Sequence, residues 1–329
     1  MYTFSDVIGH AAIIEHLQNA IRMKKISHAY ILHGEDDSGK NMLASIFAAT
    51  LQCEEGGVNP CGKCKSCMQA FTGNQPDIIR VTHEKASISV DDIRTQLNSD
   101  IQIKPYSSPY KVYIIDEAEK LTEAAQNALL KTIEEPPEYA VIFLLTNNVN
   151  VFLQTILSRC VTLNLKGVDK EQIEEYLMRE VKVPDYQAQL CADFSGGNLG
   201  RAVKYATSEE FVQMKNDVVH LLKYINDMEL SDMSDAIKQL GNNKANIGEI
   251  LDLILLWYRD VLMFKATKDV NLLLYKSEVS DIKKQADLKS FEGLEKILKA
   301  LDKVKVRLGS NVNFDIALEL LLMAMKESE

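Results

Sequence analysis

The sequence predicts an α/β fold, with a parallel sheet in the first half of the chain and only helices in the second half. Three observations support this prediction. Short apolar runs alternate with helical patterns up to about residue 166, a glycine-rich segment links the first run to a helix, and strand-like runs are absent from residue 167 onward. Alternating strands and helices are typical of βαβ units, whose helices cover both faces of a parallel sheet.

Five apolar runs are expected to form the strands of this sheet. The third, "KVYIID", is mostly apolar, as expected for a central strand buried on both faces. Between the strands, Ser89 is a favourable N-cap for a helix over 89–101, and Thr122 for a helix over 122–135 that ends at a Pro-Pro pair. The five expected strands are 28–33, 77–82, 111–116, 139–147 and 160–165.

The second half of the chain is expected to be helical throughout. Two short helical patterns, separated by Pro184, are followed by a Gly-Gly turn that opens another helix. Residues 246–264 are apolar nearly all round, which indicates a helix packed on several sides. We therefore expect structural boundaries near residues 166 and 208.

The composition of the 329-residue chain, 46% hydrophobic and 26% charged, is that of an ordinary globular protein. The N-terminal segment lacks the basic stretch and apolar run of a secretory signal, and the longest apolar stretches are too short and too charged to span a membrane. These features favour a soluble cytoplasmic protein. The net charge of −10 argues against a protein that binds nucleic acid alone across a broad surface, because such surfaces are usually basic.

The stretch "HGEDDSGKN" has the pattern of a phosphate-binding loop. Gly34, Gly39 and Lys40 match G-x-x-x-x-G-K, and the loop follows an expected strand directly and opens an expected helix. In such a loop the backbone N–H groups around Ser38 face a polyphosphate, and Lys40 lies against its β- and γ-phosphates. A glycine-rich turn with an exposed lysine is the alternative interpretation.

The metal-binding part of this site departs from the pattern. Asn41 stands where a full phosphate-binding loop has Ser or Thr, and its carbonyl oxygen lies one bond further out than the hydroxyl that binds Mg²⁺. Asp116 and Glu117 follow the third strand in the positions that hold Mg²⁺ and orient water in P-loop enzymes. Thr146 or Asn147, at the end of the fourth strand, is expected to lie beside them and contact a γ-phosphate or water. The sequence therefore predicts a degenerate site with weak or absent binding of ATP or ADP and inefficient hydrolysis.

A group of cysteines predicts a metal site. Cys61, Cys64 and Cys67 form C-x2-C-x2-C, and Cys53 lies eight positions upstream. Four thiolates suit a closed tetrahedral zinc site with a structural role. An iron–sulfur cluster is one alternative, although the C-x3-C-P continuation of such motifs is missing, and free thiols are another.

Together these segments resemble the bacterial clamp-loader subunits of DNA polymerase III, which belong to the AAA+ class. The resemblance covers about residues 4 to 205, and its most specific blocks are "NALLKTIEEPP" and "ILSRC"; "LLWYRDVLMF" and "NVNFDIALELLL" are similar to the family's C-terminal helices. It implies a RecA-like ATPase core over 1–166 with a zinc knuckle at 53–67, a small helical lid over 167–207 and an oligomerising collar over 208–329. It also implies a hetero-pentamer with gamma/tau and delta subunits that places a ring-shaped sliding clamp on primed DNA.

Two types of subunit in this family carry the zinc knuckle: the ATP-hydrolysing gamma/tau type and the delta-prime type. Asn41 favours the delta-prime type. So does the lid, where the family's arginine position falls on Gly200 and Arg201 comes one residue later, a turn of about 100° on a helix. The end of the chain near residue 329, without a long tail, points the same way. The intact Asp116-Glu117 pair favours the alternative, an active gamma/tau-like ATPase.

Without the resemblance, the simplest interpretation of Arg159, in "ILSRC", is an arginine in a surface ion pair. The resemblance implies that it is an arginine finger, inserted in trans into the ATP site of a neighbouring subunit. A finger of this kind is worth about 10³–10⁵ in rate. The chain would then complete another subunit's active site without running its own. A zinc-knuckle nucleic-acid-binding protein unrelated to clamp loading is a third interpretation, which the acidic composition disfavours.

Overall fold

The computed structural model describes residues 2–242, 246–308 and 313–327. The chain divides into two compact units, Met1–Tyr176 with Ser195–Ala202 and Leu177–Phe194 with Val203–Glu329. The division into core, lid and collar stays a prediction. The first two residues of "NVNFDIALELLL", 311 and 312, lie outside the described residues.

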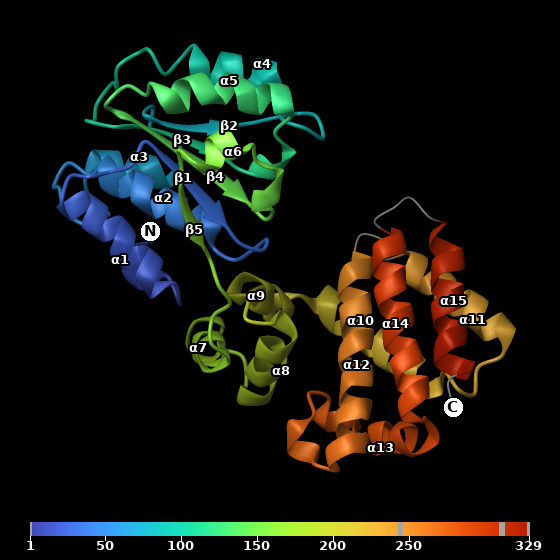
Figure 1. Cartoon of the computed structure of the whole chain (residues 1–329). Helices are drawn as coiled ribbons and strands as arrows, with labels where there is room; N and C mark the ends of the chain where they lie inside the picture. The colour runs from blue at the N-terminus through green and yellow to red at the C-terminus, as the bar shows by residue number, and fades with distance from the viewer. Residues whose placement is uncertain (1, 243–245, 309–312, 328–329) are drawn as a thin grey trace. The chain divides into compact units, whose positions relative to one another are not determined.

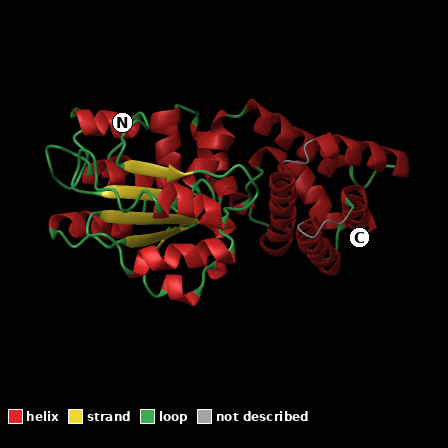
Figure 2. Cartoon of the chain, turned by 90° about the horizontal axis from the view of Figure 1, so that it is seen from above, coloured by secondary structure: helices red, strands yellow, loops and turns green. Residues whose placement is uncertain are grey.

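The first unit is built around a five-stranded parallel sheet with the order β2-β3-β4-β1-β5. Figure 2 shows this sheet in yellow with helices packed around it. All five predicted strands are confirmed, and each observed end lies within one residue of the expected one. The central strands β3 and β4 are buried along their whole length, as their apolar sequences require. The strands are β1 (Ala29–His33), β2 (Ile78–Val81), β3 (Lys111–Ile115), β4 (Ala140–Thr146) and β5 (Val161–Asn164).

Helices cover both faces of the sheet: α1 (Ala11–Arg22) and α2 (Lys40–Leu51) one face, α4 (Val90–Ile93) and α5 (Glu123–Glu134) the other (Figure 1). Successive residues of a strand point to opposite faces, so β4 contributes to an apolar cluster on each side. The remaining elements of this unit are η1 (Phe4–Asp6), α3 (Lys65–Phe71), η2 (Arg94–Asn98), η3 (Ala118–Lys120), η4 (Val149–Val151), α6 (Gln154–Leu157) and α7 (Lys170–Tyr176), and α9 (Leu199–Thr207) begins in it.

The described residues of the second unit form only helices and connecting segments. Helix α12 (Ile247–Thr267) packs against α10, α13 and α14, which explains why its sequence is apolar nearly all round. The other helices are η5 (Leu177–Val181), α8 (Asp185–Ser195), α10 (Glu209–Tyr224), α11 (Leu230–Asn242), η7 (Val270–Leu272), η8 (Lys276–Glu278), α13 (Val279–Leu288), α14 (Phe291–Leu308) and α15 (Phe314–Glu327). Within the described ranges, no helix has the length and apolar character needed to cross a membrane.

A buried carboxylate fixes the segment that follows α12. Asp260 is fully buried, and its Oδ2 accepts hydrogen bonds from the backbone N–H groups of Leu274 at 2.7 Å and Tyr275 at 2.9 Å. Asp260→Ala would leave both N–H groups without this acceptor, so we expect the free energy of unfolding to fall by about 2–4 kcal/mol. Urea unfolding measures this loss. Asp287→Ala removes an exposed aspartate paired with Lys268 at 3.6 Å and is expected to change stability by less than about 0.5 kcal/mol; equal losses would contradict the prediction.

Candidate functional site

The phosphate-loop sequence lies between β1 and α2, at the carboxyl end of the sheet. Gly34 is needed for close packing, because a Cβ there would lie 2.8 Å from Ser38 Oγ and 2.9 Å from Leu165 Cβ. Gly39 has a φ of 95° at the N-cap of α2, a conformation that favours glycine. The two glycines of the motif therefore build a tight turn that directs Lys40 into the helix.

Lys40 is bonded within its own loop. Its side chain is 9% exposed, and Nζ donates to the backbone carbonyls of Gly34 and Glu35, both at 2.6 Å. The Asp36 carboxylate lies 3.7 Å away. A lysine ammonium has three N–H donors. The two carbonyls accept hydrogen bonds from it, and the Asp36 carboxylate pairs with its charge. A phosphate would have to displace them.

The two residues expected at a metal ion are bonded to each other instead. Asn41 Nδ2 donates to Asp116 Oδ2 at 2.8 Å, and Asn41 Oδ1 accepts from Arg80 Nη1 at 3.1 Å. Arg80 also donates to Ser45 Oγ at 2.7 Å. Sequence reasoning missed Arg80, because no motif marks it and its contacts depend on how β2 is placed beside α2.

Glu117, the residue expected to orient water, is held by two cationic or potentially cationic groups. It has a left-handed backbone conformation with a φ of 48°. Its carboxylate lies 2.7 Å from Lys120 Nζ and 3.4 Å from His83 Nε2. The hydrogen bond from Lys120 is the main cause of a lowered pKa of this carboxyl group, with His83 adding to it. Glu117 is thus an ionised carboxylate already engaged in ion pairing.

Thr146 is fully buried, and its hydroxyl is used in the turn that follows β4. Its Oγ1 donates to the carbonyl of Asn148 at 3.1 Å and accepts from the Asn148 N–H at 3.1 Å. Its neighbour Asn147 is the residue that reaches the phosphate loop, through Nδ2, 3.3 Å from both carboxylate oxygens of Asp36. Any nucleotide contact of Thr146 therefore stays a prediction.

The start of α9 closes one side of the phosphate loop. Asn198 Nδ2 donates to the carbonyl of Asp36 at 2.7 Å. Gly200 lies against the loop so closely that a Cβ would be 2.3 Å from the carbonyl oxygen of Asp37. The one-residue offset does not carry Arg201 away from the loop, because its Nη2 lies 3.1 Å from Glu35 Oε2. The position where the resemblance predicts an arginine is thus Gly200, which packs on the loop, and Arg201 pairs with a loop carboxylate.

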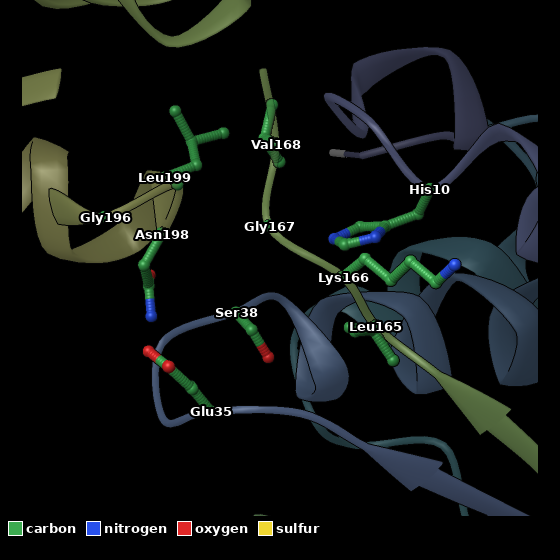
Figure 3. Close-up of a pocket in the computed structure, with 11 residues that line it drawn as sticks. His10, Glu35, Ser38, Leu165, Lys166, Gly167, Val168, Gly196, Asn198 and Leu199 are labelled. Carbon is green, nitrogen blue, oxygen red and sulfur yellow. The ribbon is translucent and has the colours of Figure 1, made fainter. Parts of the chain in front are cut away.

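A small cavity remains beside the loop, between the chain after β5 and the turn before α9. Its volume is about 110 Å³, and Figure 3 shows Glu35 and Ser38 of the loop facing Asn198 across it. Typical ligand pockets have volumes of about 300–1,000 Å³. His10 also lines the cavity, and burial lowers its pKa. In this conformation the cavity is too small for a whole nucleotide.

Arg159 lies at the other end of the sheet from the phosphate loop. It comes two residues before β5, which runs parallel to β1, whereas the loop follows the end of β1. Along the five residues of β1, at about 3.3 Å each, the two ends are on the order of 15 Å apart. Arg159 Nη2 lies 3.1 Å from Glu134 Oε1, and Nη1 donates to the carbonyl of Thr155 at 3.0 Å. Its side chain remains 40% exposed.

The four clustered cysteines have the geometry of a metal site. The Sγ atoms of Cys53, Cys61, Cys64 and Cys67 all lie within 4.8 Å of one another, and those of Cys61 and Cys67 are 3.9 Å apart. Tetrahedral zinc with Zn–S bonds of about 2.3 Å would space its sulfurs about 3.8 Å apart. The Cys64 N–H donates to Cys61 Sγ at 3.3 Å, and the Cys67 N–H to Cys64 Sγ at 3.3 Å. Backbone N–H groups lower the pKa of the Cys61 thiol to about 7. The four residues could therefore hold a metal ion such as zinc.

Known proteins place the chain in a family. The family model described as "DNA polymerase III, delta subunit" matches residues 9–169. DNA polymerase III subunit delta' from Bacillus subtilis (strain 168) is 30% identical over 318 residues, which cover 96% of this chain and 95% of that protein. The chain belongs to the DNA polymerase III delta' subunit family. Membership of this family confirms the predicted resemblance to the clamp-loader subunits of DNA polymerase III.

Proteins of the tau and gamma type are also similar to this delta' family member. DNA polymerase III subunit tau from the same Bacillus subtilis strain is 28% identical over 302 residues, 84% of this chain and 53% of that protein. The tau/gamma subunit of Haemophilus influenzae is 40% identical over 176 residues, 53% of this chain and 25% of that protein. A gamma-subunit-related protein from Thermotoga maritima aligns over 96% of this chain and 99% of its own with a TM-score of 0.46 and 21% identity, a likeness too low to add weight.

Proposed function

We propose that this chain is a delta'-type clamp-loader subunit that helps to load the sliding clamp on primed DNA without hydrolysing ATP itself. Its partners would be gamma/tau and delta subunits in a hetero-pentamer, and it would give Arg159 to the ATP site of a neighbouring subunit. The B. subtilis delta' relative, aligned along nearly the whole chain, supports this choice of subunit type. A role in replication by a bacterial polymerase also implies a cytoplasmic location.

The observation that carries the proposal is the internal pairing of Lys40. Its ammonium is buried against the carbonyls of Gly34 and Glu35, where a functioning phosphate loop would offer it to a phosphate. Burying a charge is unfavourable unless it is paired, so these bonds favour the nucleotide-free loop. The small cavity beside the loop agrees with this interpretation.

The position of Arg159 supports action in trans. Because it lies at the amino ends of the strands, it cannot reach the phosphate loop of its own chain without unfolding the sheet. A guanidinium that is 40% exposed and held by an exposed ion pair can leave Glu134 at little cost. A neighbouring ATP site would offer it the γ-phosphate of a bound nucleotide as a stronger partner.

The cysteine cluster is proposed to hold one zinc ion with a structural role. Four thiolate ligands leave no open coordination position for a substrate or water, so this site supplies no catalysis. Zinc suits the set better than harder metals, because soft thiolates select it. The zinc would fix the loop that precedes α3.

An active gamma/tau-like ATPase is the second candidate, favoured by the intact Asp116-Glu117 pair and the 40% identity to a tau/gamma subunit. The contacts of both carboxylates weigh against it. Asp116 accepts from Asn41, and Glu117 is ion-paired with Lys120. Both acidic residues thus have a structural use in the described chain.

ATP turnover of the purified chain tests the proposal. We expect no turnover above the buffer background, with or without sliding clamp and primed DNA, and no change on Lys40→Ala. The assembly with gamma/tau and delta subunits should hydrolyse ATP equally well with either version of this chain. An isolated chain that hydrolyses ATP, and loses this activity on Lys40→Ala, would overturn the proposal and support the gamma/tau-like alternative.

A further inference from the structure

We propose that the Asn41 amide, held in place by Arg80, blocks the divalent metal position in the degenerate phosphate-loop site, and that Arg80 and Asn41 together exclude metal-bound nucleotide. This inference rests on the proposed function and names the residues that enforce it. In P-loop enzymes the metal is held by the hydroxyl after the loop lysine and by the strand-end aspartate. Those two positions are here Asn41 and Asp116, and they are bonded to each other at 2.8 Å. The residues present therefore do not fit a magnesium ion.

The orientation of the Asn41 amide is fixed by its two neighbours. Its NH₂ group donates to Asp116 Oδ2, and its oxygen accepts from Arg80 Nη1 at 3.1 Å. The reversed amide would place its oxygen against the carboxylate and its NH₂ against the guanidinium, and both contacts would be repulsive. Asn41 consequently shows N–H donors, and no lone pair, to the space beside Asp116. A cation at this position would contact the NH₂ group of the amide, which cannot coordinate it.

Arg80 holds this arrangement with two points of attachment. Its Nη2 donates to Ser45 Oγ at 2.7 Å, and Ser45 lies one helical turn after Asn41 on the same face of α2. Ser45 Oγ in turn donates to the carbonyl of Asn41 at 2.6 Å. The planar guanidinium presents its donors in a rigid fork, so it spans the two positions as a lysine could not. Its positive charge, next to Asn41, also disfavours a cation bound close by.

The position of β2 explains why an arginine can serve here. Ile79 and Val81 point to the apolar cluster on the α4 and α5 side, whereas Ile78 packs on the α2 side. Alternation along the strand therefore directs Arg80 toward α2 as well. Because β2 is an edge strand, the Arg80 side chain can be exposed to solvent and still reach Asn41. Arg80 thus acts as a specificity-determining residue of the loop.

Binding of Mg·ATP to four proteins tests the inference: wild type, Asn41→Thr, Arg80→Ala and the double variant, each by calorimetry in MgCl₂ and in EDTA. Either single change leaves half of the arrangement in place, so each should bind Mg·ATP within about threefold of wild type. The double variant restores a hydroxyl and removes the competing charge. We expect it to bind at least tenfold more tightly than either single variant, and only when Mg²⁺ is present.

Three matched variants separate the charge from other effects. Asn41→Thr/Arg80→Lys keeps the positive charge and should bind as weakly as Asn41→Thr alone. Asn41→Thr/Arg94→Ala removes an exposed arginine that pairs with Asp91 at 3.9 Å, and should also remain weak. Asn41→Thr/Arg80→Gln provides a second neutral replacement and should bind Mg·ATP more tightly than Asn41→Thr alone.

Three results would overturn the inference. The first is a double variant whose affinity for Mg·ATP does not exceed that of the single variants. The second is an Asn41→Thr single variant that binds Mg·ATP as tightly as the double variant. The third is an Asn41→Thr/Arg80→Lys variant that gains as much affinity as Asn41→Thr/Arg80→Ala. The wild-type arm addresses the proposed function separately. Tight Mg·ATP binding with turnover in wild type would contradict that function, whatever the variants do.

Discussion

Arg159→Ala is expected to lower ATP turnover at the neighbouring site of the assembled clamp loader by about 10³-fold or more. An arginine finger places positive charge on the phosphoryl group in the transition state, and this contribution is worth about 10³–10⁵ in rate. Because the interaction strengthens as the reaction proceeds, kcat should fall while KM changes little. Other sites of the assembly keep their own residues, so total turnover should fall by the share of the affected site.

The Arg159→Ala substitution should affect turnover without affecting folding. Arg159 is 40% exposed, and its partner Glu134 is 45% exposed, so their ion pair contributes less than about 1 kcal/mol to stability. The variant should therefore fold and assemble normally, which thermal unfolding and native mass spectrometry can check. Arg159→Lys keeps the charge without the two-pronged geometry and should give an intermediate rate.

Arg94→Ala is the matched control for this measurement. Arg94 is a 64%-exposed arginine of the same unit with an ion pair to Asp91. Its removal changes the net charge by the same amount and should leave turnover unchanged. A normal kcat for Arg159→Ala, in an assembly shown to be intact, would remove the trans-finger proposal.

The features that the sequence predicts well are those set by local patterns. A strand buried on both faces must be a continuous apolar run, and β4 is buried along all of its residues. Helix starts are equally local: the side chain of Ser89 accepts from the Asp92 N–H, and that of Thr122 from the Ala125 N–H, as expected for N-caps. The five strands of the first unit, together with α2, α4 and α5, could therefore be predicted, whereas α1, α3 and α6 were not.

The features that the sequence does not predict depend on partners distant in the chain. The motif G-x-x-x-x-G-K does not reveal whether Lys40 faces a phosphate or its own loop. Arg80 meets Asn41 across 39 residues of sequence, through the placement of an edge strand beside a helix. The helix expected over 89–101 also changes character, because α4 continues into the π-helical η2. Such geometry follows from tertiary packing, which overrides local preference.

Contacts within the fold also explain how the acidic pair can be present in a chain that we propose does not hydrolyse ATP. Asp116 and Glu117 have the pattern of a working site, and sequence reasoning gives this pair a catalytic reading. In the fold, Asp116 accepts from Asn41 and Glu117 pairs with Lys120, so both have partners that do not require nucleotide. Their presence is consequently weak evidence for hydrolysis.

Loss of the proposed zinc ion is expected to cause the second large effect, a fall in the stability of the first unit. We predict one zinc ion per chain by elemental analysis, and loss of the metal on Cys61→Ser, because a serine hydroxyl is a poor replacement for a thiolate at a soft-ligand site. The segment between Cys53 and α3 contains no helix or strand, and many of its residues are exposed. It has little apolar burial of its own, so the metal would supply much of the free energy that orders it.

Chelation should therefore destabilise the first unit by several kcal/mol and open this segment to proteolysis. Cys61 is the preferred position for substitution, since Cys67 is fully buried and its replacement would also disturb packing. Cys160→Ser is the matched control: Cys160 lies outside the cluster, so this variant should keep its zinc and its protection. Bound iron, or no metal in a protein purified without chelators, would contradict the zinc site. Equal metal loss in the control variant would show that the effect is a general loss of folding.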